Sequence, residues 1–453
     1  MKSEYQTTTL GELIQQNGGS IKTGPFGTTL KASEYSKSGV PVISVGEVGF
    51  GEIRLHQRTP YVDRDVTERL PEYVLESGDI VFGRKGAVER SAWVKDDQDG
   101  WFLGSDGIRL RLPNTTNSRF ISYSLLTERH RSWMLTNCVG TTMHSLNQGV
   151  IERIPIVLPP LPIQNRIADI LSAFDEKIEL NRQMNRTLEQ MARALFKSWF
   201  IDFDPVHAKQ RGEQPAGMDA ETAALFPNRF EQIDGKEVPE GWRSAQLGDI
   251  AEIIDCLHSK KPERVENGFP YVQLNNIGNN GEMILSEIYL ISEEDYKKWT
   301  SRIEIREGDC IITNVGRVGA VCRIPKGFTG AIGRNMTAIR LKESFGYFSA
   351  FCIQLLTSEK MRSEINDNTD SGTILNALNV KNIPKLKFIM ADKKVVEASN
   401  IILSLMRDRI EHNLKEIDRL SQVRDSLLPR LLSGELDVSD WENAVEAPEN
   451  APA

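Results

Sequence analysis

Residues 167–199 read IADILSAFDEKIELNRQMNRTLEQMARALFKSW, and this stretch decides the fold class. Apolar and amide side chains recur in it at alternating spacings of four and three residues. The positions are Ile167, Leu171, Phe174, Ile178, Asn181, Asn185, Leu188, Ala192, Leu195 and Trp199. Such a spacing is typical of the seam of a coiled coil, which is narrower than the apolar stripe of a surface helix. We therefore predict a long helix that pairs with another.

The same spacing returns near the end of the chain. The positions are Leu403, Met406, Ile410, Asn413, Ile417, Leu420, Arg424 and Leu427. When the two helices are aligned, Asn181 and Asn413 occupy equivalent seam positions. A buried polar residue on a seam costs stability but can fix the register. We interpret the two asparagines as register residues on opposing helices, and a partly exposed kink is the alternative.

The globular sequence before each helix is also duplicated. At an offset of 229 residues, several pairs of residues match in the same order. They are Pro41 with Pro270, Gly104 with Gly333, Arg111-Leu112 with Arg340-Leu341, Leu146-Asn147 with Leu375-Asn376, and Ile154-Pro155 with Ile383-Pro384. Gly78-Asp79 matches Gly308-Asp309 at an offset one residue larger. Ordered matches at a nearly constant offset indicate an internal repeat of a domain followed by a helix.

The predicted organisation follows from this repeat. Its parts are a first domain at 1–160, a helix at 161–204, a linker at 205–240, a second domain at 241–390, a helix at 391–433 and an acidic, disordered tail at 434–453. Short apolar runs such as Val40–Val45 and Asp309–Thr313 are separated by turn glycines and predict strands. Helical patterns follow at 118–137 and 348–366. Each domain should be mixed α/β with a mostly antiparallel or mixed sheet.

The composition limits the classes of protein to which the chain can belong. The net charge of −8 argues at face value against a nucleic-acid partner. Residues 1–160 and 236–390 nevertheless each hold equal numbers of acidic and basic side chains, so either domain can carry a basic face. The five cysteines show no metal-ligand spacing and are interpreted as reduced, mostly buried residues. No long apolar run or signal core is found, so we expect a cytoplasmic protein without a membrane span.

Catalytic motifs are not found in the sequence. It has no phosphate-binding P-loop, no H-E-x-x-H, no G-x-S-x-G and no G-x-G-x-x-G. Two classes of protein remain as alternatives to a DNA-binding chain without catalytic activity. They are a fused methyltransferase or nuclease, and a coiled-coil scaffold that binds protein. Salt-sensitive binding to duplex DNA would separate the scaffold from the DNA-binding alternatives.

Motifs in a fixed order resemble the specificity subunits of type I restriction-modification enzymes. They run from about residue 10 to 440. The motifs are Thr23-Gly24-Pro25-Phe26-Gly27, Gly78-Asp79-Ile80-Val81, Gly308-Asp309-Cys310-Ile311, Leu158-Pro159-Pro160-Leu161-Pro162, the segment Ala194–Phe203 and the closing segment Ser426–Leu436. The second domain-to-helix junction, Ile383-Pro384-Lys385-Leu386, lacks the Pro-Pro-Leu of the first.

The resemblance implies a fold and a set of partners. The two domains would be target-recognition domains that read the two parts of an interrupted site in double-stranded DNA. The helices would pair antiparallel, act as a ruler and dock two methyltransferase subunits, and restriction motor subunits would join them. S-adenosylmethionine, ATP and magnesium would then belong to those partners. This chain itself would bind no cofactor or metal and would not be an enzyme. A specificity chain of a system other than type I is a third alternative.

Candidate DNA contacts in the first domain lie in loops. Arg84 and Lys85 occupy the short loop Gly83-Arg84-Lys85-Gly86, and an arginine fork matches the two acceptors of guanine. The alternative is a strand-ending turn that needs glycine. Lys22 and Lys31 are expected to contact phosphates, or simply to face solvent. His144 and Gln148 lie beside Asn147; His144 has no match in the second copy, whereas the repeated Asn147 and Asn376 are interpreted as turn residues.

The second domain offers an equivalent set. Lys260, Lys261 and Arg264 are predicted phosphate contacts in the first loop after the opening helix, with a solvated face as the alternative. Arg317 lies in the loop Gly316-Arg317-Val318-Gly319. Arg334 and Asn335 combine one guanine-type and one adenine-type reader, and a strand-entry turn is the alternative.

Overall fold

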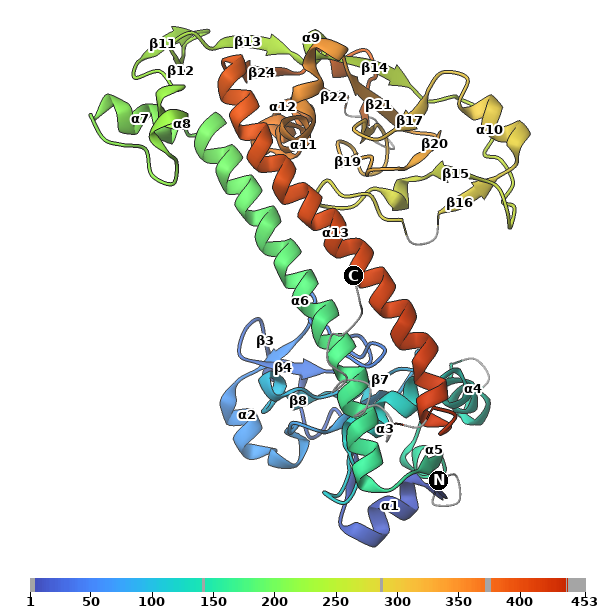
Figure 1. Cartoon of the computed structure of the whole chain (residues 1–453). Helices are drawn as coiled ribbons and strands as arrows, with labels where there is room; N and C mark the ends of the chain where they lie inside the picture. Colours follow the sequence, from blue (N-terminus) through green and yellow to red (C-terminus); the bar gives the residue numbers. More distant parts are fainter. Residues whose placement is uncertain (1–4, 141–142, 286–287, 371–375, 437, 439–453) are drawn as a thin grey trace, which may run out of the picture. The chain divides into compact units, whose positions relative to one another are not determined.

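The computed structural model describes residues 5–140, 143–285, 288–370, 376–436 and 438. The chain divides into two compact units. The first comprises Met1–Glu179 with Ile417–Ala453, and the second comprises Leu180–Glu416. Each unit holds one globular domain together with the adjoining parts of two long helices (Figure 1). The predicted organisation of a domain followed by a helix, occurring twice, is thus confirmed.

The first domain is mixed α/β. Its elements are β1 (Gln6–Thr9), α1 (Leu10–Asn17), β2 (Ser20–Thr23), β3 (Tyr35–Ser36), β4 (Val40–Ile43), β5 (Tyr61–Val62), α2 (Arg64–Arg69), β6 (Ile80–Gly83), β7 (Ser91–Trp93), β8 (Phe102–Leu103), β9 (Gly107–Arg111), α3 (Ser118–Leu126), α4 (Glu128–Asn137), α5 (Gln148–Glu152) and β10 (Pro155–Leu158). One sheet has the order β2-β9-β6-β7 and is antiparallel. The other, β3-β5-β4-β8, is mixed, because β4 and β8 run parallel.

The second domain repeats this design. Its elements, with those of the connecting segment, are α7 (Asp204–Gln210), α8 (Ala220–Ala224), β11 (Phe230–Ile233), β12 (Lys236–Pro239), β13 (Arg243–Gln246), α9 (Leu247–Ile250), β14 (Ala251–Asp255), β15 (Phe269–Val272), β16 (Tyr289–Ile291), α10 (Glu293–Trp299), β17 (Glu304–Arg306), β18 (Cys310–Thr313), β19 (Val321–Arg323), β20 (Thr329–Ile332), β21 (Met336–Leu341), α11 (Ser349–Thr357), α12 (Glu359–Asp367), β22 (Thr369–Asp370), β23 (Ala377–Leu378) and β24 (Lys387–Met390). Its sheets are β14-β21-β18-β19, which is antiparallel, and β16-β15-β20-β17, which is mixed. The predicted mixture of sheet types is confirmed in both domains.

A Leu-Gly-acid segment, Leu10-Gly11-Glu12 in the first domain and Leu247-Gly248-Asp249 in the second, forms a short helix near the start of each domain. In α1 the Thr9 hydroxyl accepts a hydrogen bond from the Glu12 backbone N–H, while the Glu12 carboxylate accepts one from the Thr9 N–H. The leucine is fully buried in both copies. A Cβ at Gly11 would lie 3.0 Å from Glu152, and one at Gly248 would lie 3.0 Å from Pro384. Glycine therefore lets each opening helix approach the end of its own domain.

Two repeated motifs meet in one partly buried ion pair. Asp79, at the start of β6, accepts two hydrogen bonds of 2.8 Å from Arg111 of β9. Asp309 accepts equivalent bonds of 2.8 and 2.6 Å from Arg340 of β21. The hydrogen bonds to these carboxylates raise the pKa of both arginines. The Gly-Asp and Arg-Leu matches of the repeat are therefore the two halves of a single structural feature.

The two long helices, α6 (Leu161–Phe200) and α13 (Lys393–Leu432), run antiparallel to one another in each unit (Figure 1). In the first unit, Leu171 shares a buried cluster with Leu428, and Asp175 pairs with Arg424 at 2.5 Å. In the second unit, Asn185 pairs with Asn413. Residue numbers in α13 fall as those in α6 rise, as an antiparallel seam requires. The predicted helix pairing is confirmed.

Asn181 and Asn413 lie on opposing helices and are fully buried. They do not bond to one another. Asn413 Nδ2 donates to Asn185 Oδ1 at 2.7 Å, and Asn181 Nδ2 donates to Glu416 Oε2 at 2.9 Å. The Oδ1 atoms of Asn181 and Asn413 are buried without a hydrogen-bond donor. This excludes the partly exposed kink and leaves the register role as a prediction.

The segment predicted as a linker, residues 205–240, needs correction. It holds α7, α8 and the β11–β12 hairpin, and it contributes Val206, Phe226 and Val238 to the core of the second unit. Phe226 packs edge-on against Trp199 of α6, with ring centroids 5.1 Å apart. Its glycines and prolines suggested a linker, but a few widely spaced apolar residues are enough to fold it onto α6.

Four further features are the proline-rich junction, the cysteines, the tail and the character of the helices. The proline-rich junction enters α6, because Pro162 lies in the first turn, where no intrahelical hydrogen bond from its nitrogen is needed. All five cysteines are free, and four of them are buried. Of the predicted tail, residues 437 and 439–453 lie outside the described residues. Among the helices described, none combines the length and the apolar character needed to cross a membrane.

Candidate nucleic-acid interface

Three loops of the first domain come together at one end of β6. They are the β6–β7 hairpin loop at 83–90, the loop at 23–27 and the described parts, 138–140 and 143–148, of the loop after α4. The Gly86 N–H donates to the His144 carbonyl at 2.9 Å, and the Leu146 N–H donates to the Arg84 carbonyl at 2.8 Å. Gln148 Nε2 donates to Thr23 Oγ1 at 3.1 Å. Four of the predicted contact residues, Arg84, Lys85, His144 and Gln148, therefore share one surface.

This surface, which we call the first loop cluster (residues 23–27, 83–90, 138–140 and 143–148), presents donors to solvent. The Arg84 guanidinium lies 5.0 Å from the ring centroid of Phe26 and donates to the Ser105 carbonyl at 3.2 Å. Phe26 is 56% exposed. Lys85 Nζ lies 3.4 Å from Asp106. Because Arg84 makes one side-chain hydrogen bond to the described residues, most of its donors remain available for guanine or phosphate.

His144 is exposed, and its Nδ1 lies 2.7 Å from the Cys138 sulfur. Its Nε2 can therefore face a ligand. The repeated Asn147 has the structural role that the sequence favoured: its side chain accepts from the Val150 N–H at 2.9 Å and caps α5. Leu375, the neighbour of the matching Asn376, lies outside the described residues. The exposed Phe26 belongs to the motif Thr23–Gly27, but the sequence gives no reason to expect that it contacts DNA.

The two lysines near the start of the first domain are not loop neighbours. Lys22 lies within β2, where it pairs with Arg109 of β9, and its ammonium sits 5.1 Å from the ring centroid of Tyr73. Its expected place in a loop is therefore wrong, because the strand begins directly after the glycines that end α1. Lys31 is exposed in the turn before β3. Neither residue belongs to the first loop cluster.

The equivalent hairpin of the second domain is built differently. Arg317 donates to the Ile277 carbonyl at 2.7 Å, the Gly278 carbonyl at 3.1 Å and the Asn279 side chain at 2.7 Å. This network favours a structural role over guanine reading. Gly316 and Gly319 have φ of 88° and 75°, so the turn needs glycine here. Gly86 of the first domain has φ of 76°.

The remaining predicted contacts of the second domain fall in two places. Asn335 adopts a left-handed φ of 64° directly before β21, which supports a strand-entry turn, and its neighbour Arg334 is exposed. Lys260, Lys261 and Arg264 lie in the loop after β14, one strand later than expected. The Lys261 ammonium lies 4.2 Å from the ring centroid of Tyr289, and the Arg264 guanidinium lies 6.0 Å from it. This cationic edge remains a candidate phosphate contact.

One group with metal-ligand chemistry was missed in the sequence. Asp255, Cys256 and His258 place one ligand atom each within 4.8 Å of one another. His258 Nε2 lies 2.7 Å from Asp255, and Arg302 lies 3.8 Å from the same carboxylate. Burial raises the pKa of the Cys256 thiol. A protonated thiol and a carboxylate facing an arginine are poor cation ligands, so the arrangement favours an ion-pair network over a metal centre.

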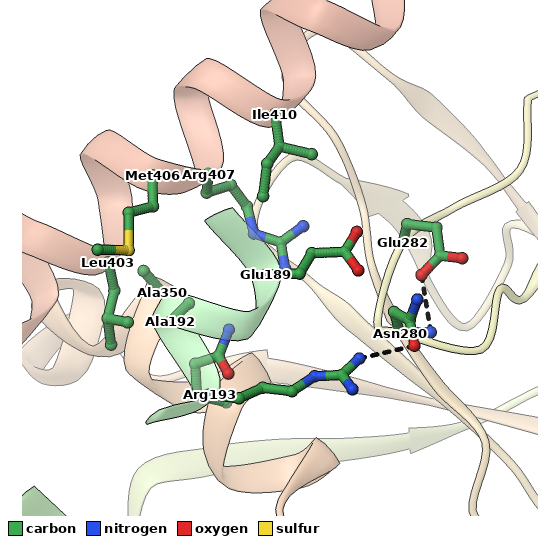
Figure 2. Close-up of a pocket in the computed structure, with 11 residues that line it drawn as sticks. Glu189, Ala192, Arg193, Asn280, Glu282, Ala350, Leu403, Met406, Arg407 and Ile410 are labelled. Atoms are coloured by element: carbon green, nitrogen blue, oxygen red, sulfur yellow. Dashed lines mark hydrogen bonds between the residues drawn. The ribbon is translucent and has the colours of Figure 1, made fainter. Parts of the chain in front are cut away.

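A partly exposed polar cluster ties the second domain to its helices (Figure 2). Arg193 of α6 donates to the Asn280 side chain at 2.6 Å, and the Asn280 N–H donates to Glu282 at 2.8 Å. Burial raises the pKa of Glu189 and lowers that of Arg407, which faces it from α13. This cluster fixes the turn at 278–281 against α6 and leaves that turn few free groups for a ligand.

The fold thus defines a class of protein with two related α/β domains joined by antiparallel helices. A family model for the type I restriction modification DNA specificity domain matches residues 2–190 and 239–397. The chain belongs to this family.

Individual relatives agree with this assignment. The chain is 25% identical to the type I restriction enzyme HindI specificity subunit of Haemophilus influenzae over 417 residues, which cover 80% of this chain and 87% of that protein. It is 24% identical to the MjaIX specificity subunit of Methanocaldococcus jannaschii over 97% of this chain and 98% of that protein. The crystal structure of the S subunit from M. genitalium has a similar fold, with a TM-score of 0.55 at 18% identity, over 94% of this chain and 96% of that one.

Proposed function

We propose that this chain is the non-catalytic DNA-recognition subunit of a type I restriction-modification complex. Each globular domain reads one part of an interrupted site in duplex DNA, and the paired helices set the spacing between the two parts. Methylation and ATP-dependent cleavage belong to other subunits.

One observation carries the proposal. The two domains keep the same Asp–Arg pair, at Asp79–Arg111 and Asp309–Arg340, but place different side chains on the loops around it. The hairpin loop that holds Arg84 and Lys85 in one domain holds Val315 and Arg317 in the other. A constant scaffold with variable loops is what two readers of different base sequences require, because sequence is read by side chains at base edges.

The helices offer a place for protein partners. On α13, Ile401 and Leu405 are 64% and 67% exposed, and on α6, Leu180 and Met191 are 52% and 49% exposed. Large apolar side chains on the solvent face of a helix favour a protein contact. We propose that two methyltransferase subunits dock on the helices and that restriction motor subunits join them. S-adenosylmethionine, ATP and magnesium would be bound by those subunits.

A domain exchange tests this function. Residues 8–158 are replaced by the matching domain of another family member, and the chain is expressed with its methyltransferase. Methylation-sensitive long-read sequencing of the host genome then reports the modified motif. We expect one part of the motif to change and the other to stay. A motif that changed in both parts, or methylation without any interrupted motif, would refute independent reading.

A further inference from the structure

Two arginines of the first domain converge on one exposed aromatic ring. Phe50, at the tip of the turn at 49–51, is 45% exposed. The Arg131 guanidinium of α4 lies 4.3 Å from its ring centroid, and that of Arg90 lies 5.7 Å from it. The two guanidinium carbons are thus within about 10 Å of each other, the sum of these distances. We call these three residues the Phe50 stack.

The Phe50 stack has no acidic partner among the described residues. The Nε atoms of Arg90 and Arg131 are both buried without a hydrogen-bond acceptor. Among the described residues, neither guanidinium forms an ion pair. The nearby carboxylate of Glu52 is already paired with Arg54. Two positive charges that share one small site repel each other, and an unpaired buried donor costs free energy. A bound anion would offset the repulsion between the two guanidinium groups.

The stack is continuous with the first loop cluster. The Gly83 N–H donates to the Arg90 carbonyl at 3.1 Å, so Arg90 closes the hairpin loop that carries Arg84 and Lys85. Helix α4, which carries Arg131, leads directly into the loop of His144. The turn is held on the same edge, because the Gly51 N–H donates to the Ser91 carbonyl at 2.8 Å. The same extended ligand could therefore reach both sites.

The second domain places two arginines beside the equivalent turn, although the residue that matches Arg90 in the hairpin is Ala320. The bridge between Gly281 and Cys322 matches that between Gly51 and Ala92 in the first domain. Beside this turn, Arg317 of the hairpin and Arg362 of α12 line one hollow. Arg362 matches Arg131, since each donates its N–H to the residue that precedes its helix. The helix arginine is therefore common to both copies, whereas Arg90 belongs to the first domain alone and Arg317 of the second domain holds its own turn.

We propose that the Phe50 stack binds a backbone phosphate of duplex DNA, with Arg90 and Arg131 as the donors and the ring as the platform that aligns them. This inference rests on the proposed DNA-recognition function and adds a contact that positions the duplex without reading its sequence. Arginine forks are suited to phosphate, because their donors match its oxygens in pairs. The partner is nucleic acid rather than an acidic protein surface, because the stack continues the loop cluster that carries the candidate base readers.

The test uses the full chain and short duplexes of arbitrary sequence. Binding is measured by fluorescence anisotropy at several salt concentrations for the wild type and for the double variant R90Q/R131Q. Each phosphate contact contributes about 0.9 to the slope of log affinity against log salt. We expect the double variant to lose about 0.9 from the slope and to bind all duplexes more weakly by the same factor. R131K, which keeps the charge, should retain most of the slope.

Arg58→Gln is the matched control, because Arg58 is an exposed arginine of the same domain outside the stack. Thermal melting of each variant checks that the domain is folded. If the wild type shows no salt-sensitive DNA binding, the proposed function itself fails. If the wild type binds DNA and the double variant keeps its full slope, the phosphate site is refuted. Unchanged DNA binding with lost methyltransferase association would also overturn it, in favour of an acidic protein surface.

Discussion

In the first domain, the β6–β7 hairpin holds Arg84 beside exposed Phe26, with one side-chain hydrogen bond to a carbonyl. In the second domain, the β18–β19 hairpin directs Arg317 inward, where three acceptors of the turn at 277–279 hold it. The two hairpins have the same position in the sheet and the same glycine turn. Duplication has therefore preserved the strand scaffold while the cations at its rim acquired different partners.

The difference extends to the turn beneath each hairpin. Phe50 is exposed between two arginines, whereas Asn280 is tied to Arg193 of α6 and to the loop of Glu282. The first domain thus leaves donors free at its rim, and the second uses them for its own packing. Replacing a buried residue that is paired costs stability, whereas replacing an exposed residue of a rim loop does not. The two domains therefore differ in their rim loops and agree at the Asp–Arg pair.

The largest expected effect on stability concerns the Asp–Arg pair that both domains share. Asp79→Asn and Asp309→Asn should each lower the free energy of unfolding of their own domain by about 2–3 kcal/mol. This is somewhat less than for a fully buried pair, because the arginines are partly exposed. Chemical denaturation of the full chain measures the loss. Glu76→Gln, which alters the exposed partner of Arg111, is the control and should cost under about 1 kcal/mol. Losses that differ greatly between the two aspartates would show that the scaffolds are not equivalent.

The second prediction concerns the helix seam of the second unit. In the second unit, Asn413→Ala leaves the Asn185 amide buried without its partner and should cost about 2 kcal/mol. The double variant N185L/N413L should instead be at least as stable as the wild type, since neither of these two positions then holds an unpaired amide. Thermal melting of the full chain distinguishes the two. If the double variant is as unstable as Asn413→Ala, the asparagines contribute more than a satisfied polar pair.

The third prediction separates the two hairpins. Arg84→Ala should weaken binding to the recognised duplex about tenfold and leave stability nearly unchanged, since a guanine contact is worth about 1–3 kcal/mol. Arg317→Ala should lower the stability of the second domain by about 1 kcal/mol, because it removes hydrogen bonds within the chain. Anisotropy and denaturation are run on both proteins. The opposite pattern would reverse the roles that we assign to the hairpins.

The smallest expected effect depends on pH. His130 of α4 is buried, and burial lowers the pKa of its imidazole. The unfolded chain then binds the proton more readily, so stability is complete above the unfolded pKa of about 6.5 and falls as pH drops toward the folded value. The matching residue of α12 is Met361, which does not titrate. His130→Met should remove part of the acid sensitivity of the first domain, as measured by melting temperature against pH. An unchanged pH profile would assign that sensitivity to other groups.

The sequence by itself determined the architecture of this protein. The seam from Ile167 to Trp199 and its copy from Leu403 to Leu427 required two paired helices, because a heptad spacing buries only one face. The matches at Asp79, Arg111 and their copies required two domains of one fold. Such patterns are readable because they depend on local periodicity and on order along the chain, which need no knowledge of contacts.

Only the tertiary structure decided which side chains share a site. It brought Arg84, His144 and Gln148 together across loops far apart in the sequence, and it placed Lys22 in a strand. It also folded residues 205–240 onto α6, which their composition hid, and turned Arg317 inward while Arg84 stayed outward. Loop contacts depend on backbone geometry and on competition among several acceptors. A single sequence contains no periodic pattern that reports either one.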